Sequence, residues 1–222
     1  MRGTQLQVST SDLVFRMKPV SLLVSEFSRQ PIVVTQIEGI SLYRFFRSRF
    51  VDPLGFGYAP SRFSDPRIDH PTSARFGVVH LATTFEIAFI ETILRDRGDG
   101  RIGPLAVPEA ELMDWRCARI DVIAAMSLAD LASGPARLKM GIPSDVTGAK
   151  DQKASQIWSL AIHGHPAEVA GIAWASRLHG GTCYAVYDRA LAKLRVSAIR
   201  PLTEFPRELA AFLRRYRIAL IP

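Results

Sequence analysis

The sequence predicts a mixed α/β fold of the α+β class, built as one domain around a small central β-sheet. At 222 residues the chain is long enough for one sizeable hydrophobic core and does not require two domains. Apolar residues make up 48% of the chain and charged residues 22%, as in ordinary soluble globular proteins. Strand-like and helix-like segments are interleaved without regular alternation, which argues against a repeated βαβ array.

The N-terminal region, residues 1–36, has no clear hydrophobic period and is interrupted by Pro19 and Pro31. We expect it to form an arm that packs on the domain or on a partner. The domain itself is expected over residues 37–222. Its first strand is predicted at residues 38–46, where apolar and aromatic residues predominate.

Residues 51–71 are rich in proline, glycine, serine and aspartate, and this composition predicts a long irregular loop. Loops of this length inside compact domains are usually functional or disordered. This loop also carries aromatic and arginine side chains, namely Phe56, Tyr58, Phe63, Arg62 and Arg67. We therefore expect a ligand-binding loop.

A short buried strand is predicted at residues 76–81, followed by a helix that runs to about Arg95. Thr83 and Glu86 have the spacing of a capping box at the start of that helix. The later elements are a turn-rich connection at 104–110, strands at 116–126, 171–176, 182–187 and 196–199, a helical turn at 128–132, and helices at 152–163 and 204–216. The strands on either side of Gly180 and Gly181 are expected to form a hairpin.

The formal net charge of +7 reflects 28 lysines and arginines against 21 acidic residues, and most of the basic residues are arginine. Arginine is well suited to recognise phosphate and carboxylate groups. The basic residues are spread along the chain and form no nucleic-acid-binding motif, so we expect no direct nucleic-acid binding. The chain also lacks a Walker A loop and a G-x-G-x-x-G fingerprint after a strand, which excludes the Gly-rich modes of nucleotide binding.

No apolar segment approaches the roughly 20 residues that span a bilayer, and residues 1–30 lack the apolar region of a secretory signal. Cys117 and Cys183 are isolated and show neither metal-ligand spacing nor a disulfide framework. We expect a cytoplasmic protein with two buried thiols, no metal site and no membrane association.

Glu91 is the first candidate for chemistry. On a helix its neighbours Ile87, Ala88 and Leu94 are apolar, and Arg95 follows at position i+4. By periodicity alone, Glu91 belongs to the solvated stripe of an otherwise apolar helix. A partly buried glutamate could instead act as an acid, a base or a stabiliser of developing positive charge.

Four other positions combine a reactive or charged side chain with a distinctive context. Arg62 lies in PSRFSDP, where a guanidinium in a Pro-bounded loop can grip a pyrophosphate, and Arg44 lies in LYRFF. Ser176 follows a predicted strand in WASRLHGG, without the G-x-S-x-G context of an acyl-transfer nucleophile. His80 lies in the predicted strand before Glu91, where an imidazole can stack, donate a hydrogen bond or carry charge near pH 6.5. Each also has a simpler interpretation, as a surface charge or a turn-capping residue.

In these contexts the arginine, glutamate and serine resemble the signature residues of RES-domain proteins, the toxins of bacterial toxin–antitoxin pairs. The resemblance covers roughly residues 41–188. It implies a fold similar to that of ADP-ribosyltransferases of the diphtheria-toxin type, with a split β-sheet that clasps NAD in a cleft. The implied activity is the destruction of NAD at the nicotinamide–ribose bond, by hydrolysis or by phosphorolysis. NAD is then the substrate and not a cofactor, with inorganic phosphate as co-substrate in the second case.

The resemblance also implies roles for individual residues. The implied catalytic set is Glu91, Arg62 and Ser176, and the implied substrate-binding set is Arg44, His80, Tyr43 and Phe63. Glu91 would stabilise the positive charge that develops on the ribose, and Arg62 would hold the pyrophosphate or an attacking phosphate. His80 departs from the family pattern, in which tyrosine is common at this position.

The implied partner is an Xre-like antitoxin with a helix-turn-helix, which would block the cleft with a C-terminal segment in a hetero-oligomer. Two other interpretations stay open at this point. The chain could transfer ADP-ribose to a macromolecule, or it could be a non-enzymatic basic module that binds nucleic acid or an acidic protein. The last of these predicts steep salt dependence and no turnover of NAD.

Overall fold

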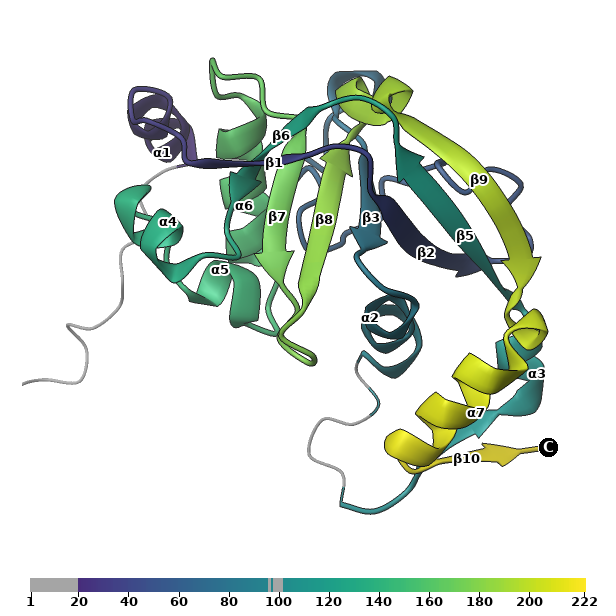
Figure 1. Cartoon of the computed structure of the whole chain (residues 1–222). Coiled ribbons are helices and arrows are strands. Elements are labelled where there is room, and N and C mark those ends of the chain that lie inside the picture. The colour runs from purple at the N-terminus through teal and green to yellow at the C-terminus, as the bar shows by residue number, and fades with distance from the viewer. Residues whose placement is uncertain (1–19, 96, 98–101) are drawn as a thin grey trace, which may run out of the picture.

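The structure is a computed structural model that describes residues 20–95, 97 and 102–222 (Figure 1). Residues 1–19, most of the expected N-terminal arm, lie outside this range. The fold is mixed α/β around a curled central sheet, which confirms the predicted fold class.

The helices and strands follow one another irregularly along the chain. In order they are α1 (Val20–Phe27), β1 (Val34–Ile37), β2 (Ser41–Arg47), η1 (Thr72–Ala74), β3 (Val78–Ala82), α2 (Phe85–Phe89), η2 (Ile90–Leu94), β4 (Leu105–Pro108), α3 (Glu109–Met113), β5 (Trp115–Val122), β6 (Met126–Asp130), α4 (Gly134–Lys139), α5 (Asp145–Gly148), α6 (Lys153–His163), β7 (Gly171–Ala175), β8 (Thr182–Tyr187), η3 (Asp188–Lys193), β9 (Leu194–Pro201), η4 (Leu202–Glu204), α7 (Pro206–Arg215) and β10 (Ile218–Ile221).

Within the described residues, the central sheet has eight strands in the order β1-β6-β7-β8-β3-β2-β5-β9, and β10 pairs with β4 in a separate two-stranded sheet. The central sheet is therefore large, where a small one was expected. The pairing between β2 and β3, in the middle of the sheet, is short: the two strands share one register pair, Tyr43 with Ala82. By contrast β2 pairs with β5 along its whole length and β3 pairs with β8 from end to end. The two halves of the sheet therefore part beside this single pair.

Two apolar layers cover the two faces of the sheet, and the pleat of β8 shows how they separate. Cys183, Ala185 and Tyr187 face the layer that includes α2 and α6, whereas Tyr184 and Val186 face the opposite layer. Helix α6 packs on β7, α1 packs on α6, and α2 lies against β2 and β3 (Figure 1). The helix that carries Glu91 is therefore placed at the opening between the two halves.

Several predicted elements are confirmed and others are wrong. The loop over 51–71, the strand before Glu91, the hairpin of β7 and β8, and the helices α6 and α7 are all present. Residues 128–132, expected as a helical turn, lie mostly in β6, which is buried between β1 and β7. The turn-rich connection at 104–110 contains β4, because its partner strand β10 comes from the far end of the chain. These pairings are long-range, so local composition did not indicate them.

The helix after β3 begins as predicted but one residue later. The cap is Thr84, whose side chain accepts a hydrogen bond from the Ile87 amide at 3.2 Å. Thr83 instead donates its hydroxyl proton to the Thr182 carbonyl, at 3.0 Å. The second half of the helix, η2, is a π-helix, a wide turn that often occurs at functional sites.

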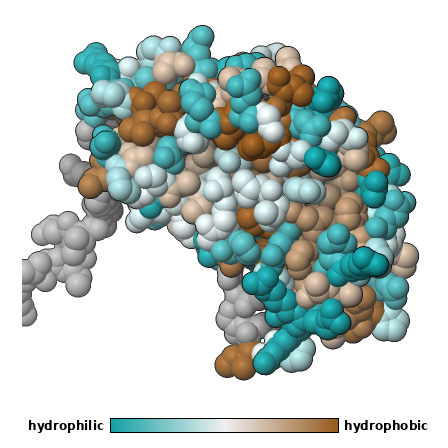
Figure 2. Space-filling view, in the orientation of Figure 1, coloured by the Kyte–Doolittle hydropathy of each residue, from teal (hydrophilic) through white to brown (hydrophobic). Residues whose placement is uncertain are grey.

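Apolar and polar side chains are interspersed over the face of the molecule shown in Figure 2. Large apolar residues that remain exposed include Val20 and Leu22 in α1 and Val34 in β1. Scattered exposed apolar residues are ordinary on soluble proteins. No described helix is long and apolar enough to cross a membrane.

Candidate active site

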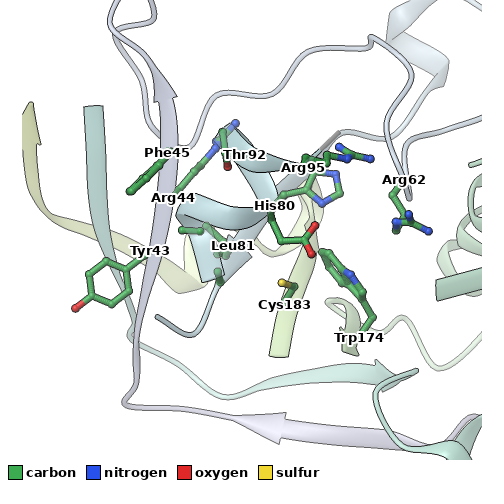
Figure 3. A pocket seen from close by; sticks show the side chains of 13 residues that line it. Tyr43, Arg44, Phe45, Arg62, His80, Leu81, Thr92, Arg95, Trp174 and Cys183 are labelled. Atoms are coloured by element: carbon green, nitrogen blue, oxygen red, sulfur yellow. The ribbon is translucent and has the colours of Figure 1, made fainter. Parts of the chain in front are cut away.

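A cavity of about 280 Å³ opens where β2 and β3 part (Figure 3). Its lining includes Arg44 from β2, His80 from β3, Arg62 from the long loop, Glu91, Thr92 and Arg95 from the end of the helix, and Trp174 and Cys183 from β7 and β8. Segments far apart in the sequence therefore meet in one enclosed space. A concave site with a few convergent charged groups is the usual form of a small-molecule site.

Glu91 and Ser176 form the closest polar contact at the site. The Ser176 hydroxyl donates its proton to Oε1 of Glu91. The hydroxyl oxygen of Ser176 in turn accepts hydrogen bonds from the amides of Leu178 at 3.3 Å and His179 at 3.1 Å. Ser176 is only 2% exposed and does not line the cavity. The Ser176 hydroxyl thus uses both its proton and its oxygen in hydrogen bonds. In this geometry it orients the Glu91 carboxylate.

The turn after Ser176 owes its form to two glycines. Gly180 has a positive φ of 78°, and its amide donates to the Ser176 carbonyl at 2.7 Å. A Cβ on Gly181 would stand 2.4 Å from Cδ1 of Ile87, so only glycine lets the turn approach the helix that carries Glu91. The predicted Gly-Gly turn therefore brings the serine to the glutamate.

Arg62 is buried, with 7% of its surface exposed, and its guanidinium is held by two groups. Nη2 donates to the Ala149 carbonyl at 2.9 Å, and Nη1 lies 3.5 Å from the Ser155 hydroxyl. Arg44 is also anchored, because its Nη1 donates to the Pro53 carbonyl at 2.6 Å. Burial lowers the pKa of Arg44 to about 10, partly offset by Asp52, so it stays cationic at neutral pH.

His80 lies between the cationic groups and a tryptophan. Its Nε2 is 3.2 Å from the Ser61 hydroxyl, and its ring meets the edge of Trp174 at 5.7 Å between centroids. Burial, followed by the charges of Arg44, Arg95 and Arg62, lowers the pKa of His80 to about 3. The imidazole is therefore neutral throughout the physiological range. The sequence-based option of a charge near pH 6.5 at this position is not supported.

The two aromatic residues of the expected substrate-binding set are placed differently: Tyr43 lines the cavity, whereas Phe63 does not. The ring of Tyr43 points away from His80 and Trp174 (Figure 3) and lies 6.4 Å from that of Phe85. Phe63 is fully buried, and its ring packs edge-on against Trp174 at 5.0 Å. Phe63 thus supports the cavity wall from behind.

Among the lining residues that sequence reasoning missed, Arg95 brings a charge and Trp174 an aromatic ring to the cavity. Arg95 was treated as part of a solvated stripe, although its spacing of four residues from Glu91 placed both on one helix face. Trp174 lies two residues before Ser176, and the period of a strand puts both on the same face. The alternation of side chains along this strand could therefore have identified Trp174 as a candidate site residue.

The charges at the cavity are unbalanced. Among the described residues the lining carries three guanidinium groups, those of Arg44, Arg62 and Arg95, and one carboxylate, that of Glu91. Cys183 also lines the cavity, but burial and then Glu91 raise the pKa of its thiol, so it stays protonated and inert. The site therefore attracts a ligand with more than one negative charge and presents it to a single carboxylate.

No group of three or more histidine, cysteine or acidic side chains that could hold a metal ion occurs in the described part of the chain.

The lowered histidine pKa values predict acid sensitivity of the fold. The pKa of His80 is lowered to about 3 and that of His163 to about 4, in both cases chiefly by burial. A folded state that binds fewer protons than the unfolded state is most stable above the unfolded pKa of about 6.5. We expect the melting temperature to fall as pH drops from about 6.5 towards 4, and to fall less in the His80→Gln/His163→Gln double variant. An equal slope in both proteins, measured by thermal unfolding at several pH values, would contradict this assignment.

Comparison with known proteins gives a family match and a similar protein of known sequence. The sequence profile of the RES domain matches residues 41–208. A protein of Sinorhizobium fredii (strain NBRC 101917 / NGR234) named "Probable toxin y4kH" is 34% identical over 128 residues, which cover 58% of this chain and all of that protein.

The fold also has a solved counterpart. The crystal structure of the M. tuberculosis MbcT–MbcA toxin–antitoxin complex contains a chain that matches with a TM-score of 0.61 at 18% identity. The match covers 88% of this chain and 96% of that one. The identity is low, so this likeness concerns the fold.

Proposed function

Because the chain belongs to the RES-domain family, we propose that it is the toxin of a toxin–antitoxin pair and that it cleaves the nicotinamide–ribose bond of NAD. The observation that carries this proposal is the meeting of the Ser176-oriented Glu91 with three arginines in the cavity between β2 and β3. A dinucleotide joined by a pyrophosphate matches that distribution of charge.

The chemistry requires stabilisation of positive charge more than proton transfer. As the bond to nicotinamide breaks, the ribose gains oxocarbenium character, as in glycoside cleavage. The Glu91 carboxylate is suited to stabilise that charge. Nicotinamide leaves as a neutral molecule and takes the bonding electron pair, while an oxygen of water or phosphate bonds to the ribose carbon. An attacking water releases its proton to the solvent. No strong general acid is needed, which agrees with the low pKa of about 3 for His80.

The arginines would bind the remainder of the substrate. The cavity volume of about 280 Å³ is close to the lower end of ligand pockets, so it would hold the nicotinamide–ribose end and leave the adenosine outside. A guanidinium binds a phosphate through two parallel hydrogen bonds, and Arg62 and Arg44 are already anchored by backbone carbonyls. Trp174, backed by Phe63, offers an aromatic wall for the base.

Replacing Ser176 with alanine tests the orienting role of its hydroxyl. We expect kcat for NAD cleavage to fall by about ten- to a hundredfold with little change in KM, because the carboxylate keeps its charge but loses its orientation. Steady-state kinetics of Ser176→Ala beside the wild type gives both constants. A rise in KM alone would show that Ser176 binds substrate directly.

The activity itself is tested with purified protein, free of antitoxin, and NAD in buffers with and without inorganic phosphate. Nicotinamide with ADP-ribose in both buffers indicates a glycohydrolase. Turnover that requires phosphate and yields a phosphorylated ADP-ribose indicates a phosphorylase. Transfer of labelled ADP-ribose to a macromolecule indicates a transferase. No release of nicotinamide under any of these conditions contradicts the proposal and favours a non-enzymatic binding module.

We further propose an antitoxin of the Xre-like class as the partner, which covers the cavity in a cytoplasmic hetero-oligomer. The likeness to a chain from a toxin–antitoxin complex and the one-sided charge of the cavity support this proposal. Co-expression with the product of the adjacent open reading frame, followed by affinity purification, tests it. The expected result is a stable complex that lacks NAD turnover until the partner is removed.

A further inference from the structure

The buried face of α6 is polar where an ordinary core helix is apolar. Ser155 and Ser159, one helical turn apart, are both 0% exposed, as is Ile162 on the next turn. A buried hydroxyl costs free energy unless it forms a hydrogen bond, and alanine would fill either position without that cost. The hydrogen-bond partners of these hydroxyl groups therefore indicate which structural role keeps serine at these positions.

The partners are the carbonyl groups of the two residues that flank Arg62 in the chain. The Ser159 hydroxyl donates to the Phe63 carbonyl at 2.7 Å, and Nε2 of Gln156 donates to the Ser61 carbonyl at 3.0 Å. One helix therefore binds the carbonyls of both neighbours of Arg62, Ser61 and Phe63. A turn closed by the Ser64 amide on the Ser61 carbonyl, at 3.1 Å, completes the local structure.

Ser155 extends the same arrangement to the guanidinium. Its hydroxyl donates to the Val146 carbonyl at 2.5 Å, which leaves its oxygen lone pair towards Nη1 of Arg62 at 3.5 Å. Side chains of α6 therefore contact both the backbone beside Arg62 and its guanidinium, and α6 itself packs on β7. Residues that fix the backbone of a binding group act by keeping it within a fraction of an ångström of its working position.

We propose that Gln156 and Ser159 are positioning residues that hold the Arg62 loop in its ligand-binding conformation. The identity of the substrate in this proposal rests on the proposed function. The part that concerns the loop conformation rests only on the observed contacts. Neither side chain lines the cavity, so each acts through Arg62.

Tyr187 supplies a matched control for a purely structural role. Its hydroxyl donates to the Ser159 carbonyl at 3.1 Å and lies 3.1 Å from the Ser159 hydroxyl, in the same buried cluster. Because the hydroxyl bonds to Ser159 and not to the loop carbonyls, Tyr187→Phe removes a buried hydroxyl and leaves both carbonyls with their donors. If the two substitutions acted only by lowering the stability of the fold, Tyr187→Phe and Ser159→Ala should lower the melting temperature by similar amounts.

The experiment compares the wild type with Gln156→Ala, Ser159→Ala, their double variant and Tyr187→Phe, all as the full chain. KM and kcat for NAD, the Kd for inorganic pyrophosphate by calorimetry, the melting temperature, and hydrogen exchange of the peptide over residues 60–66 are measured. In the double variant we expect KM and the pyrophosphate Kd to rise by about tenfold or more, with kcat within about threefold, and exchange to become faster. Tyr187→Phe should lower the melting temperature without these changes.

A double variant that loses melting temperature but keeps its KM and its exchange rate overturns the proposal. So does a Tyr187→Phe variant with the same rise in KM. If the wild type does not turn over NAD, the proposed function fails, whereas pyrophosphate affinity and loop exchange still decide the positioning role. If the double variant does not fold, Gln156→Ala alone decides it, because that side chain is partly exposed and its loss leaves the core intact.

Discussion

Replacing Glu91 with glutamine is expected to lower kcat for the proposed NAD cleavage by about a thousandfold, since it removes the carboxylate that would stabilise the developing oxocarbenium. The amide has the same shape and can still accept the proton of Ser176, so the local structure should persist. Measured rates of nicotinamide release, together with unchanged thermal unfolding, would establish that the loss is chemical.

Glu86→Gln is the matched control for this variant. Glu86 lies on the same helix, but its carboxylate binds the Tyr216 hydroxyl at 2.6 Å and Arg215 at 3.1 Å, outside the cavity. Its neutralisation should leave kcat within a few-fold of the wild type. If Glu91→Gln and Glu86→Gln retained equal activity, Glu91 would have no part in the chemistry and the proposed mechanism would be wrong.

Removal of the Arg62 charge should have the second-largest effect. We expect Arg62→Gln to lower kcat/KM for NAD by roughly a hundredfold or more, mainly through KM, because a buried and pre-oriented guanidinium would no longer meet the pyrophosphate. Steady-state kinetics over a wide range of NAD concentrations separates KM from kcat.

Arg195→Gln serves as the comparison, since the Arg195 side chain is 67% exposed and only loosely paired with Asp121 at 3.8 Å. Loss of one surface charge there should change kcat/KM little at moderate salt. Equal effects of the two substitutions would mean that overall positive charge, and not the Arg62 loop, attracts the substrate.

Hydrogen bonds of Asp65 help to explain how so irregular a loop holds Arg62 in one place. Asp65 is 1% exposed and accepts hydrogen bonds from the Phe76 amide at 3.1 Å and from Nε of Arg67 at 2.9 Å. Burial alone would raise its pKa, but the hydrogen bonds from Arg67 and Phe76 outweigh burial and keep the pKa below its usual value. The carboxylate stays ionised at neutral pH and ties the loop near Arg62 to Phe76, just before β3.

Local sequence patterns predicted those features that depend on neighbours in the chain. The helix with Glu91, the glycine turn after Ser176 and the loop with Arg62 follow from periodicity, capping and turn chemistry, which operate over a few residues. For the same reason the errors fell on β4 and β6, whose strand partners are distant in the sequence.

The site shows the same division between local and long-range information. Residue patterns along the chain predict the mixed α/β class and single out an arginine, a glutamate and a serine in distinctive contexts. Only the tertiary structure decided that Ser176 orients Glu91 across 85 positions of the chain, that Trp174 and Arg95 complete the cavity, and that α6 holds the Arg62 loop. These contacts depend on strand order and on the place where β2 and β3 part, and such long-range pairings leave little trace in local residue patterns.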